Sequence, residues 1–445
     1  MAKLSLANAV AIAFHSADWR SNQMAIVARK LFNKPKKKTW IASLAGRTVE
    51  QFPRRPSLVL LERFISRDLG FRQAIKTNNI SSFSLRDVLG KKSVASLKWD
   101  LPAINSVQDL CDLLALTRAD LDWLAKLKTR PSDGSFSPSE HYVYTWIKKR
   151  ASGFRLIESP KSLLKETQRR ILDEIISKIP THDRAHGFCV DRSVVSFVQP
   201  HVKKQFCLKM DLRDFFPTIQ FGRVWGLFQS VGYDSDVARC LAAICTNAIG
   251  QSTINEGTRI RGRRSQKTNL LYSRRHLPQG SPSSPSLANL IAFRLDARLA
   301  GLAEKISNSN QNSNNATNVS YTRYADDILF SADDRSIASK NFAATVGAIA
   351  IEEGFQIHYR KTKLMHCSQR QTATGVVIND VTNLARPEFD RLKAILHNCS
   401  KHGFEHENRE GIPNFAEHLQ GRIGWVRQLN RNKAEKLQAV FDSIE

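Results

Sequence analysis

The sequence predicts an α+β fold, because strand-forming segments occupy the middle of the chain and helical patterns fill both ends. Residues 1 to about 80 and 386–445 carry apolar side chains at helical spacing. Between them, Phe206–Asp211 and Tyr321–Ser331 are rich in aromatic and other strand-favouring residues. Helices and strands that are grouped in separate runs are typical of α+β domains.

The bulk composition indicates a globular protein with an anionic partner. The chain has 445 residues, 42% of them hydrophobic, and a formal net charge of +26, which suits two or three domains. Nucleic acid is favoured over a membrane surface, because no apolar run reaches spanning length. The seven cysteines form no CxxC pair, so neither a zinc site nor a disulfide framework is indicated. The N-terminus lacks a signal pattern, so we expect a cytoplasmic protein with no membrane contact.

The first 180 residues are predicted to be mostly helical, with one hairpin. Ser106 and Thr117 each stand three residues before an aspartate, which predicts two short capped helices. Aromatic side chains recur at every second position from Tyr142, which predicts a β-hairpin over 142–157 with Arg155 on a strand. There Arg155 is either a phosphate contact or a plain surface arginine. An amphipathic helix is expected over 160–179.

The next segments combine helices with basic and rigid loops. Residues 222–250 are predicted to be helical, and 251–276 to form a polar, strongly basic loop. Arg263 and Arg264 belong to this loop, which fits either solvated surface or contact with a phosphate backbone. The Pro/Ser/Gly-rich loop 278–285 leads into a helix whose first amides could face an anion, although it also fits a simple turn.

The last third is predicted to alternate helices with short strands. A helix is expected over 337–353, a strand and basic turn over 354–363, and a hairpin edge over 372–378. Helical patterns return over 386–445, with Trp425, Val426 and Leu429 on one face.

Three carboxylates stand at positions that favour chemistry. Asp211 ends a strand, where it is either a satisfied structural residue or a metal ligand. Asp326 and Asp327 fall at a tight hairpin between two strand-forming runs. Adjacent carboxylates repel and need a cation or a proton, and Mg²⁺ prefers such oxygens. A solvated surface turn is the alternative for Asp326 and Asp327 alone. With Asp211 they make the set that two-metal phosphoryl transfer needs.

Several ordered motifs resemble those of the reverse transcriptase family. Tyr324-Ala-Asp-Asp327 is similar to its palm hairpin, and Met210-Asp-Leu-Arg-Asp-Phe-Phe-Pro217 to its first metal-binding motif. Leu277–Pro285 resembles the loop that contacts template and nucleotide. Gly153–Ile157 with Leu164–Gln168, and then Ala185-His-Gly-Phe188, resemble the fingers motifs. Absence of a GxxxxGK[ST] loop weakens an NTPase interpretation.

Within that family the chain most resembles bacterial retron enzymes. Thr374-Gly-Val-Val-Ile-Asn379 is similar to the retron Val-Thr-Gly motif, with Ala373 where valine is usual. His201 is retained from an Asn-Ala-x-x-His motif associated with RNA recognition, while Phe197-Val198 replace Asn-Ala.

The resemblance implies a right-hand polymerase fold of fingers, a palm with an antiparallel sheet, and a helical thumb, preceded by an α-helical N-terminal extension. It places the extension and linker at 1–104 and the fingers with two leading short helices at 105–205. The palm would span 206–384, with a fingers insertion at about 222–276, and the thumb 385–445.

The resemblance also implies a role for each matching residue. Asp211, Asp326 and Asp327 would be catalytic and would hold two Mg²⁺ ions with the backbone carbonyl of Leu212. The incoming deoxynucleotide would contact Arg155, Phe216 as a steric gate, Gln279, Gly280 and Lys361. Lys363 is close enough in sequence to be the alternative to Lys361. Nucleic acid would meet His201, the arginines 263 and 264, and the primer-grip pair Thr374 and Gly375.

A retron assignment implies one cognate structured noncoding RNA that serves as template and supplies the priming 2′-hydroxyl. The product would be branched multicopy single-stranded DNA made from deoxynucleotides, in phage defence with an effector protein. Two alternatives stay open at this point. One is another bacterial defence or group II intron-related reverse transcriptase, and the other is a non-catalytic RNA-binding scaffold.

Overall fold

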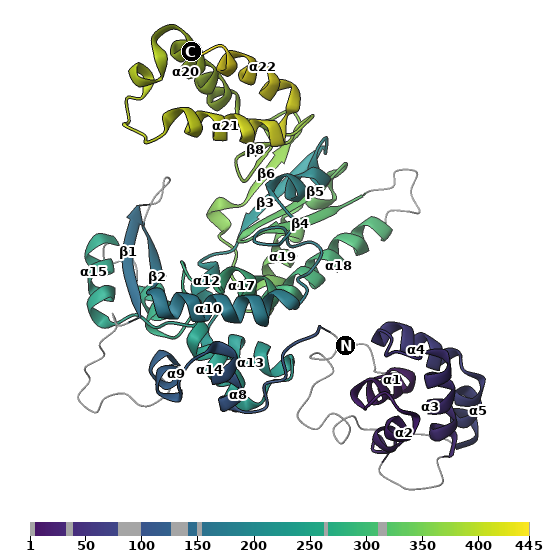
Figure 1. Ribbon diagram of the computed structural model, residues 1–445. Coiled ribbons are helices and arrows are strands. Elements are labelled where there is room, and N and C mark those ends of the chain that lie inside the picture. Colours follow the sequence, from purple (N-terminus) through teal and green to yellow (C-terminus); the bar gives the residue numbers. More distant parts are fainter. Residues whose placement is uncertain are drawn as a thin grey trace. The chain divides into compact units, whose positions relative to one another are not determined.

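The computed structural model describes residues 5–32, 39–78, 99–125, 141–148, 154–261, 266–309 and 318–444. The chain divides into two compact units (Figure 1). The first comprises Met1–Ile179, Gln220–Arg275 and Gly280–Ser283, and the second Pro180–Ile219, His276–Gln279 and Ser284–Glu445. No helix in the described ranges is long and apolar enough to cross a membrane. The predicted contacts Arg263 and Arg264 lie outside the described residues.

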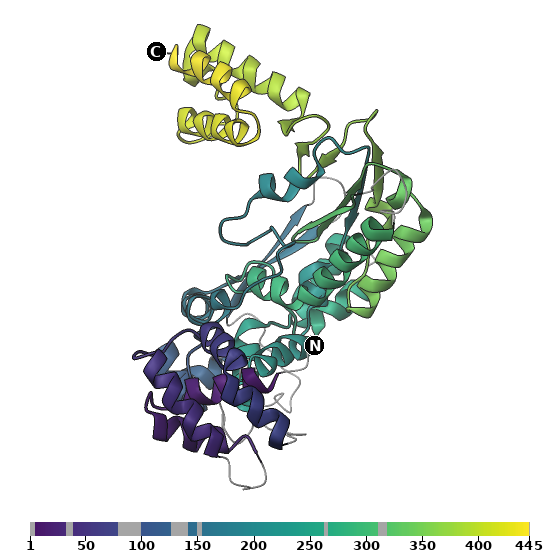
Figure 2. The same cartoon turned by 90° about the vertical axis from the view of Figure 1, so that its right-hand side faces the viewer.

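The first helices of the chain confirm the helical prediction for its N-terminal segment. They are α1 (Leu6–Ser16), α2 (Ser21–Arg29), α3 (Thr39–Gln51), α4 (Leu58–Arg67) and α5 (Leu69–Asn78). Figure 2 shows them as the purple bundle. Small alanines alternate with larger apolar residues in their shared core, which lets the helices approach closely: Ala9, Ala13, Phe14, Met24, Leu44 and Ile65.

The rest of the first unit consists of a β-hairpin and short helices. Strands β1 (Tyr142–Lys148) and β2 (Phe154–Pro160) pair antiparallel, as predicted. The helices are α8 (Val107–Leu114), α9 (Arg118–Ala125), α10 (Ser162–Glu174), η1 (Ile176–Lys178), α13 (Phe221–Ser230), α14 (Ser235–Cys245), α15 (Gln251–Arg261) and α16 (Gln266–Ser273). The Ser106 and Thr117 side chains accept from the amides of Asp109 and Asp120, which confirms both predicted caps.

The prediction of a basic loop over 251–276 was wrong. Helices α15 and α16 cover most of it, because Ile254 and Tyr272 pack with Leu156 in a small core. Gly257 lets α15 approach β1 closely, since a Cβ there would lie 2.3 Å from the Trp146 ring. Tertiary packing therefore outweighs the polar composition of this segment.

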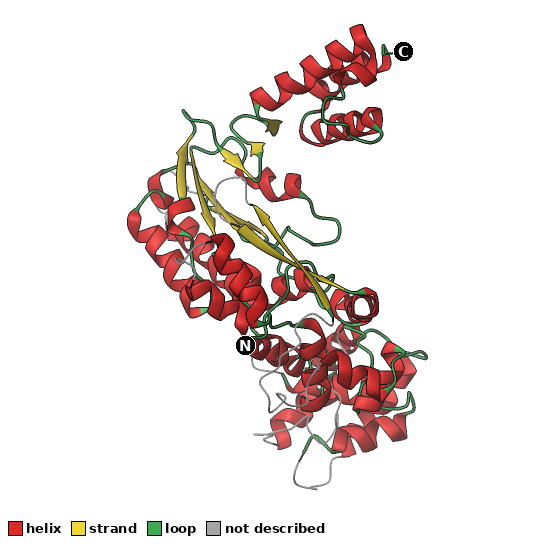
Figure 3. Cartoon of the chain, turned by 90° about the vertical axis from the view of Figure 1, so that its left-hand side faces the viewer, coloured by secondary structure: helices red, strands yellow, loops and turns green. Residues whose placement is uncertain are grey.

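A four-stranded antiparallel sheet organises the second unit (Figure 3). Its order is β4 (Ser320–Tyr324), β5 (Asp327–Ala332), β3 (Phe206–Asp211) and β6 (Lys363–His366). Helices α18 (Phe293–Ser309) and α19 (Lys340–Glu352) pack on one face, where Phe330 meets Phe342 at 5.0 Å between ring centroids. On the other face lie α11 (Val194–Val198) and η2 (Gln199–His201), whose His201 reaches β4 and β5.

Shorter elements complete the second unit. They are α12 (Phe215–Thr218), α17 (Ser284–Ile291), η4 (Arg335–Ile337), η5 (Tyr359–Lys361), β7 (Thr372–Ala373), β8 (Val376–Val377) and β9 (Asn383–Leu384). Of the strand and basic turn expected over 354–363, the strand does not form, because Ile357 makes only an isolated bridge with Leu212. The expected hairpin at 372–378 is confirmed by β7 and β8.

The C-terminal residues form three helices with their own core, as their apolar spacing predicted. They are α20 (Arg386–Glu407), α21 (Phe415–Leu429) and α22 (Arg431–Asp442). Leu392, Leu419, Val426 and Leu437 are buried among them.

Residues 180–205, assigned by the sequence to the fingers, belong to the second unit. Ala185 forms a bridge with Arg323 of β4, and His201 bonds Ser331 and Thr322. These contacts link the segment to the four-stranded sheet.

Candidate functional site

The three carboxylates predicted from sequence come together at one end of the four-stranded sheet. Asp211 is the last residue of β3 and pairs directly with Asp327, the first residue of β5. Asp326 lies in the two-residue turn that joins β4 to β5, and its carbonyl accepts the Leu212 amide at 2.8 Å. Directly paired residues of antiparallel strands project from the same face of a sheet, so Asp211 and Asp327 are neighbours.

The hairpin turn is held in an unfavourable backbone conformation. Ala325 has φ +54°, a left-handed value that costs a residue with a Cβ about 1 kcal/mol or more. Gly187 packs directly beneath, where a Cβ would lie 2.7 Å from the Ala325 nitrogen. The amide of His186 also donates to the Arg323 carbonyl at 2.7 Å. The segment 185–188 is therefore a support for the carboxylate turn.

Replacing Gly187 by alanine should displace this turn. We expect at least a tenfold loss of deoxynucleotide incorporation, since misplacing reacting groups by about 1 Å costs about 100-fold in rate. Single-turnover incorporation on a primed RNA template measures it. Gly301→Ala is the matched control, because its Cβ would meet nothing within 4 Å on helix α18. Full activity in Gly187→Ala would contradict the supporting role.

A buried ion pair anchors the strand that leads into the turn. Arg323 donates to both carboxylate oxygens of Asp296, at 2.7 and 2.6 Å, and both side chains are fully buried. The same guanidinium donates to the Ala325 carbonyl at 2.9 Å and to Asn289 at 3.1 Å. Tyr321 donates its hydroxyl to Asp296 at 2.7 Å. This network was not predicted from the sequence, although an arginine inside the strand-forming run before the turn was a visible signal.

Two lysines balance only part of the negative charge of the three carboxylates. Lys361 Nζ lies 2.8 Å from Asp211 Oδ2, and Lys209 Nζ lies 3.1 Å from Asp327 Oδ1. Burial, followed by the charges of Asp327 and Asp211, raises the pKa of Asp326. Burial also raises the pKa of Asp327, while Lys209 opposes that shift. The site therefore favours additional positive charge.

Aromatic side chains line the approach to the carboxylate turn. Phe216, predicted as the steric gate, stands five residues after Asp211 and lies half-buried on α12. The Phe188 ring, about half exposed, lies 6.3 Å from both Phe216 and Tyr324 between centroids. Phe188 was not predicted as a site residue, though it ends the Ala185–Phe188 motif.

Other predicted nucleotide contacts belong to the first unit or to its boundary. Arg155 is exposed on β2. Gln279 and Gly280 lie in the rigid loop 278–285, where Gln279 ends a segment of the second unit and Gly280 begins one of the first. Gly280 has φ +133°, and a Cβ there would lie 2.7 Å from the Glu158 carbonyl oxygen. Glycine is thus required where this loop meets β2. A buried network fixes the loop, since Ser281 donates to Gln168 at 2.8 Å and Gln168 donates to the Ile244 carbonyl.

His201 does not make the nucleic-acid contact that the sequence suggested. Its ring is fully buried and bonds Ser331 Oγ at 2.6 Å and Thr322 Oγ1 at 2.8 Å. Burial lowers its pKa to about 3. A side chain with no exposed surface cannot reach RNA, so His201 instead ties η2 to the sheet beneath the site.

This burial predicts a pH dependence of stability. Between pH 3 and 6.5 the unfolded chain binds a proton at His201 that the folded chain excludes, so stability is lost as pH falls below 6.5. The contribution is about 1.4 kcal/mol per pH unit. Urea unfolding of His201→Gln at pH 7.5 and pH 5 should show a smaller pH difference than wild type. The exposed His397→Gln is the control, and an unchanged pH difference in His201→Gln would refute the assignment.

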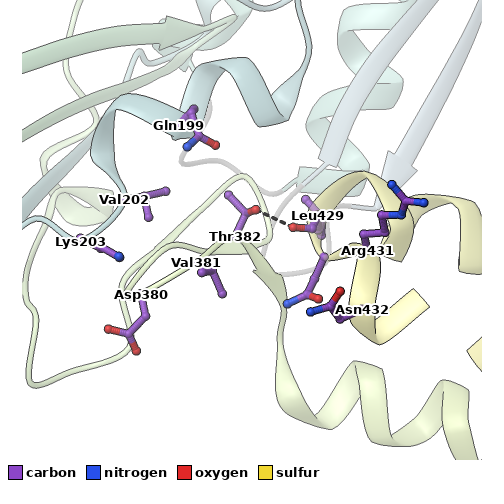
Figure 4. Close-up of a pocket in the computed structure, with 10 residues that line it drawn as sticks. Gln199, Val202, Lys203, Asp380, Val381, Thr382, Leu429, Arg431 and Asn432 are labelled. Carbon is purple, nitrogen blue, oxygen red and sulfur yellow. Dashed lines mark hydrogen bonds between the residues drawn. The ribbon is translucent and has the colours of Figure 1, made fainter. Parts of the chain in front are cut away.

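The predicted primer-grip residues occupy a tight turn between β7 and β8. Thr374 and Gly375 both have positive φ, +45° and +84°, as a two-residue hairpin turn requires. The chain then continues to a cavity of about 630 Å³ beside the α21–α22 junction (Figure 4). Lys203, Arg431 and Asp380 line it, so its charges are of both signs. Within this lining, Thr382 donates to the Leu429 carbonyl at 2.6 Å (Figure 4).

Comparison with known proteins identifies the class. The family model for reverse transcriptase (RNA-dependent DNA polymerase) matches residues 147–395, more than half of the chain. The protein belongs to the reverse transcriptases, and the antiparallel sheet carrying the three carboxylates fits their right-hand polymerase fold.

Curated relatives narrow this class to one group. The chain is 34% identical to the retron Mx65 reverse transcriptase of Myxococcus xanthus, over 82% of this chain and 77% of the relative. It is 27% identical to the retron Ec86 reverse transcriptase of Escherichia coli, over 78% of this chain and 91% of the relative. The protein is a bacterial retron reverse transcriptase, an RNA-directed DNA polymerase, as the motif resemblance predicted.

Solved structures show only a distant likeness. A telomerase from Candida albicans, in complex with a fragment of telomeric RNA, is 12% identical with a TM-score of 0.33. The likeness covers 73% of this chain and 59% of that one, so this chain spans about three fifths of the telomerase.

Proposed function

We propose that Asp211, Asp326 and Asp327 hold two Mg²⁺ ions that support deoxynucleotide addition. One observation carries the proposal, namely the pairing of Asp211 with Asp327 at adjoining strand ends, with Asp326 in the connecting turn. A pair of divalent ions supplies charge stabilisation and an acidified attacking hydroxyl in such reactions.

The residues present fit divalent metal by charge and by ligand type. Carboxylate oxygens are the ligands that Mg²⁺ prefers, and the raised pKa values of Asp326 and Asp327 indicate a need for cations. Among the described residues, no group of three or more His, Cys, Asp or Glu side chains is arranged to hold a metal ion by itself. The proposal therefore rests on the strand pairing of Asp211 with Asp327 and on the charge of the three carboxylates.

The backbone of Leu212 is oriented to take part. Its amide donates toward the turn, to the Asp326 carbonyl. In extended backbone the amide and carbonyl of one residue point to the same side. The hydrogen bonds of the Leu212–Ile357 bridge are made by the neighbouring residues, from the Arg213 amide to the Gln356 carbonyl and from the His358 amide to the Asp211 carbonyl. The amide and carbonyl of Leu212 therefore both point away from Ile357, toward the turn. We propose that the Leu212 carbonyl oxygen is a further metal ligand.

The remaining residues bind and discriminate the nucleotide. Arg155 would contact the triphosphate, Gln279 and Gly280 would line the nucleotide pocket, and Lys361 would stabilise the departing pyrophosphate. Lys361 already pairs with Asp211 and is half exposed, so it can turn toward a phosphate.

Phe216 would exclude ribonucleotides by shape, since its ring would clash with a 2′-hydroxyl. Phe216→Ala should raise the efficiency of ribonucleotide use relative to deoxynucleotide use by about 10–200-fold, the range for one pocket group. Competition between the two nucleotides on one primed template measures the ratio. Phe216→Tyr keeps the ring and should discriminate as wild type does. An unchanged ratio in Phe216→Ala would exclude the gate.

The nucleic-acid partner proposed is one structured noncoding RNA and its cDNA. The +26 net charge suits a polyanion. Thr374 and Gly375 would lie near the primer, helices α20–α22 would act as the thumb, and Arg263 and Arg264 would contact the phosphate backbone. We further propose that a 2′-hydroxyl of this RNA primes synthesis, and that the branched DNA acts in phage defence with an effector protein.

Sequencing nucleic acid that copurifies with the protein tests this assignment. Branched DNA linked to a single RNA is expected. Unlinked or repetitive cDNA would favour another bacterial defence or group II intron-related enzyme. Bound RNA with no deoxynucleotide incorporation would favour a non-catalytic scaffold.

A further inference from the structure

Two lysines face one another across adjoining strands beside the carboxylate turn. Lys209 of β3 pairs directly with Lys363 of β6. Paired residues project from the same face of a sheet, and residues two apart on one strand also share a face. Lys209 and Lys363 therefore lie on the face that carries Asp211 and Asp327.

This arrangement is unfavourable for the protein alone. Like charges directly opposite on neighbouring strands destabilise a sheet. Lys209 is partly compensated by Asp327, at 3.1 Å. Lys363 is exposed and makes no ion pair with any residue that the structure describes. An edge-strand lysine can discourage strand addition, which suits Lys363 on β6. That role does not explain Lys209, which lies on the inner strand β3.

We infer that Lys209 and Lys363 together bind a backbone phosphate of the strand that supplies the attacking hydroxyl. This inference rests on the proposed function of the carboxylates. Once those carboxylates hold metal cations, Lys209 loses its anionic partner, and two ammonium groups share one face beside the reacting end. The end of the primer must reach Asp211 to react. The last phosphates of the primer are therefore the anions that come nearest to the sheet face carrying Lys209 and Lys363.

The first test uses the salt dependence of binding. Each phosphate contact contributes about 0.7–0.9 to the slope of log affinity against log salt concentration. An RNA template annealed to a chain-terminated DNA primer is titrated with Mg²⁺ present and no nucleotide. Lys209→Gln and Lys363→Gln should each lower the slope by up to about 0.9. Lys204→Gln is the matched control, since Lys204 pairs with Asp333 beyond the other end of β3 and should leave the slope unchanged.

The second test locates the phosphate. Neutral methylphosphonate is placed singly at each of the last linkages of the primer. At one linkage it should weaken wild-type binding several-fold but leave Lys209→Gln and Lys363→Gln unaffected, because their contact is already lost. Equal, additive losses at every linkage would overturn the inference, as would unchanged salt slopes in both lysine variants.

The two proposals fail separately. A wild-type protein that binds the terminated primer but does not extend an ordinary one contradicts the proposed metal site. A wild-type protein that extends primers normally, with unchanged salt slopes in both variants, contradicts only the phosphate contact. Thermal midpoints of the variants confirm folding, and that of Lys363→Gln should equal or exceed wild type because a like charge is removed.

Discussion

Asp326→Asn should abolish deoxynucleotide incorporation and raise the stability of the metal-free protein. Asparagine keeps the size of the side chain but removes a charged metal ligand, so the rate should fall by more than about 1000-fold. Single-turnover incorporation on a primed RNA template measures this loss. Incorporation by Asp326→Asn at the wild-type rate would contradict the metal site. Asp333→Asn is the control, because Asp333 lies beyond the opposite end of β5, and it should keep full activity.

The stability change follows from the pKa of Asp326. Burial and the neighbouring carboxylates raise it in the folded chain above its ordinary value of 3.8. The folded chain therefore holds this proton more tightly, and stability falls as pH rises from 3.8 through the raised pKa. Asp326→Asn removes that loss, so its thermal midpoint in EDTA at pH 7.5 should exceed wild type. The difference should vanish toward pH 4, and an equal midpoint at pH 7.5 would contradict the charge repulsion.

Arg323→Met is expected to destabilise the protein by about 3–5 kcal/mol, because it leaves Asp296 buried without a counter-ion. Both side chains are fully buried, so solvent does not screen the pair. The loss should appear as a lower urea midpoint. Incorporation should fall as well, since Arg323 also holds the Ala325 carbonyl beside the catalytic turn.

Two comparisons isolate the buried charge. Arg298→Met breaks ion pairs with Glu352 and Glu353 in which the arginine itself is exposed, so it should lower the urea midpoint much less than Arg323→Met does. The double variant Arg323→Met with Asp296→Leu removes both charges and should recover most of the lost stability. A double variant no more stable than Arg323→Met would mean that hydrogen bonds, rather than charge, anchor the strand.

Local sequence patterns predicted much of the secondary structure. The Ser106 and Thr117 caps, the β1–β2 hairpin and the strand ending at Asp211 are confirmed, because each depends on neighbours within a few residues. Composition gave a wrong prediction where a segment is buried by residues that are distant in the sequence. The basic stretch 251–276 is mostly helical, because Ile254 and Tyr272 meet Leu156 in a core that distant residues complete.

The residues of the candidate site also differ in whether local sequence or distant contacts reveal them. The carboxylates were visible because aspartates at strand ends and turns are conspicuous. The assignment of His201 to RNA was wrong, because its partners Ser331 and Thr322 lie more than a hundred residues away. Gly187 and the Arg323–Asp296 pair were missed for the same reason, since nothing local marks which residues will lie against the turn.

The amino-acid sequence by itself determined the α+β class, the hairpin that presents Asp326 and Asp327, and the membership of the reverse transcriptases. These follow from short-range backbone preference and from motif order along the chain. Only the tertiary structure decided that Asp211 pairs with Asp327, that His201 lies in the core, and that Lys209 faces Lys363. The reason is physical: strand register and burial are set by contacts between residues far apart in the chain.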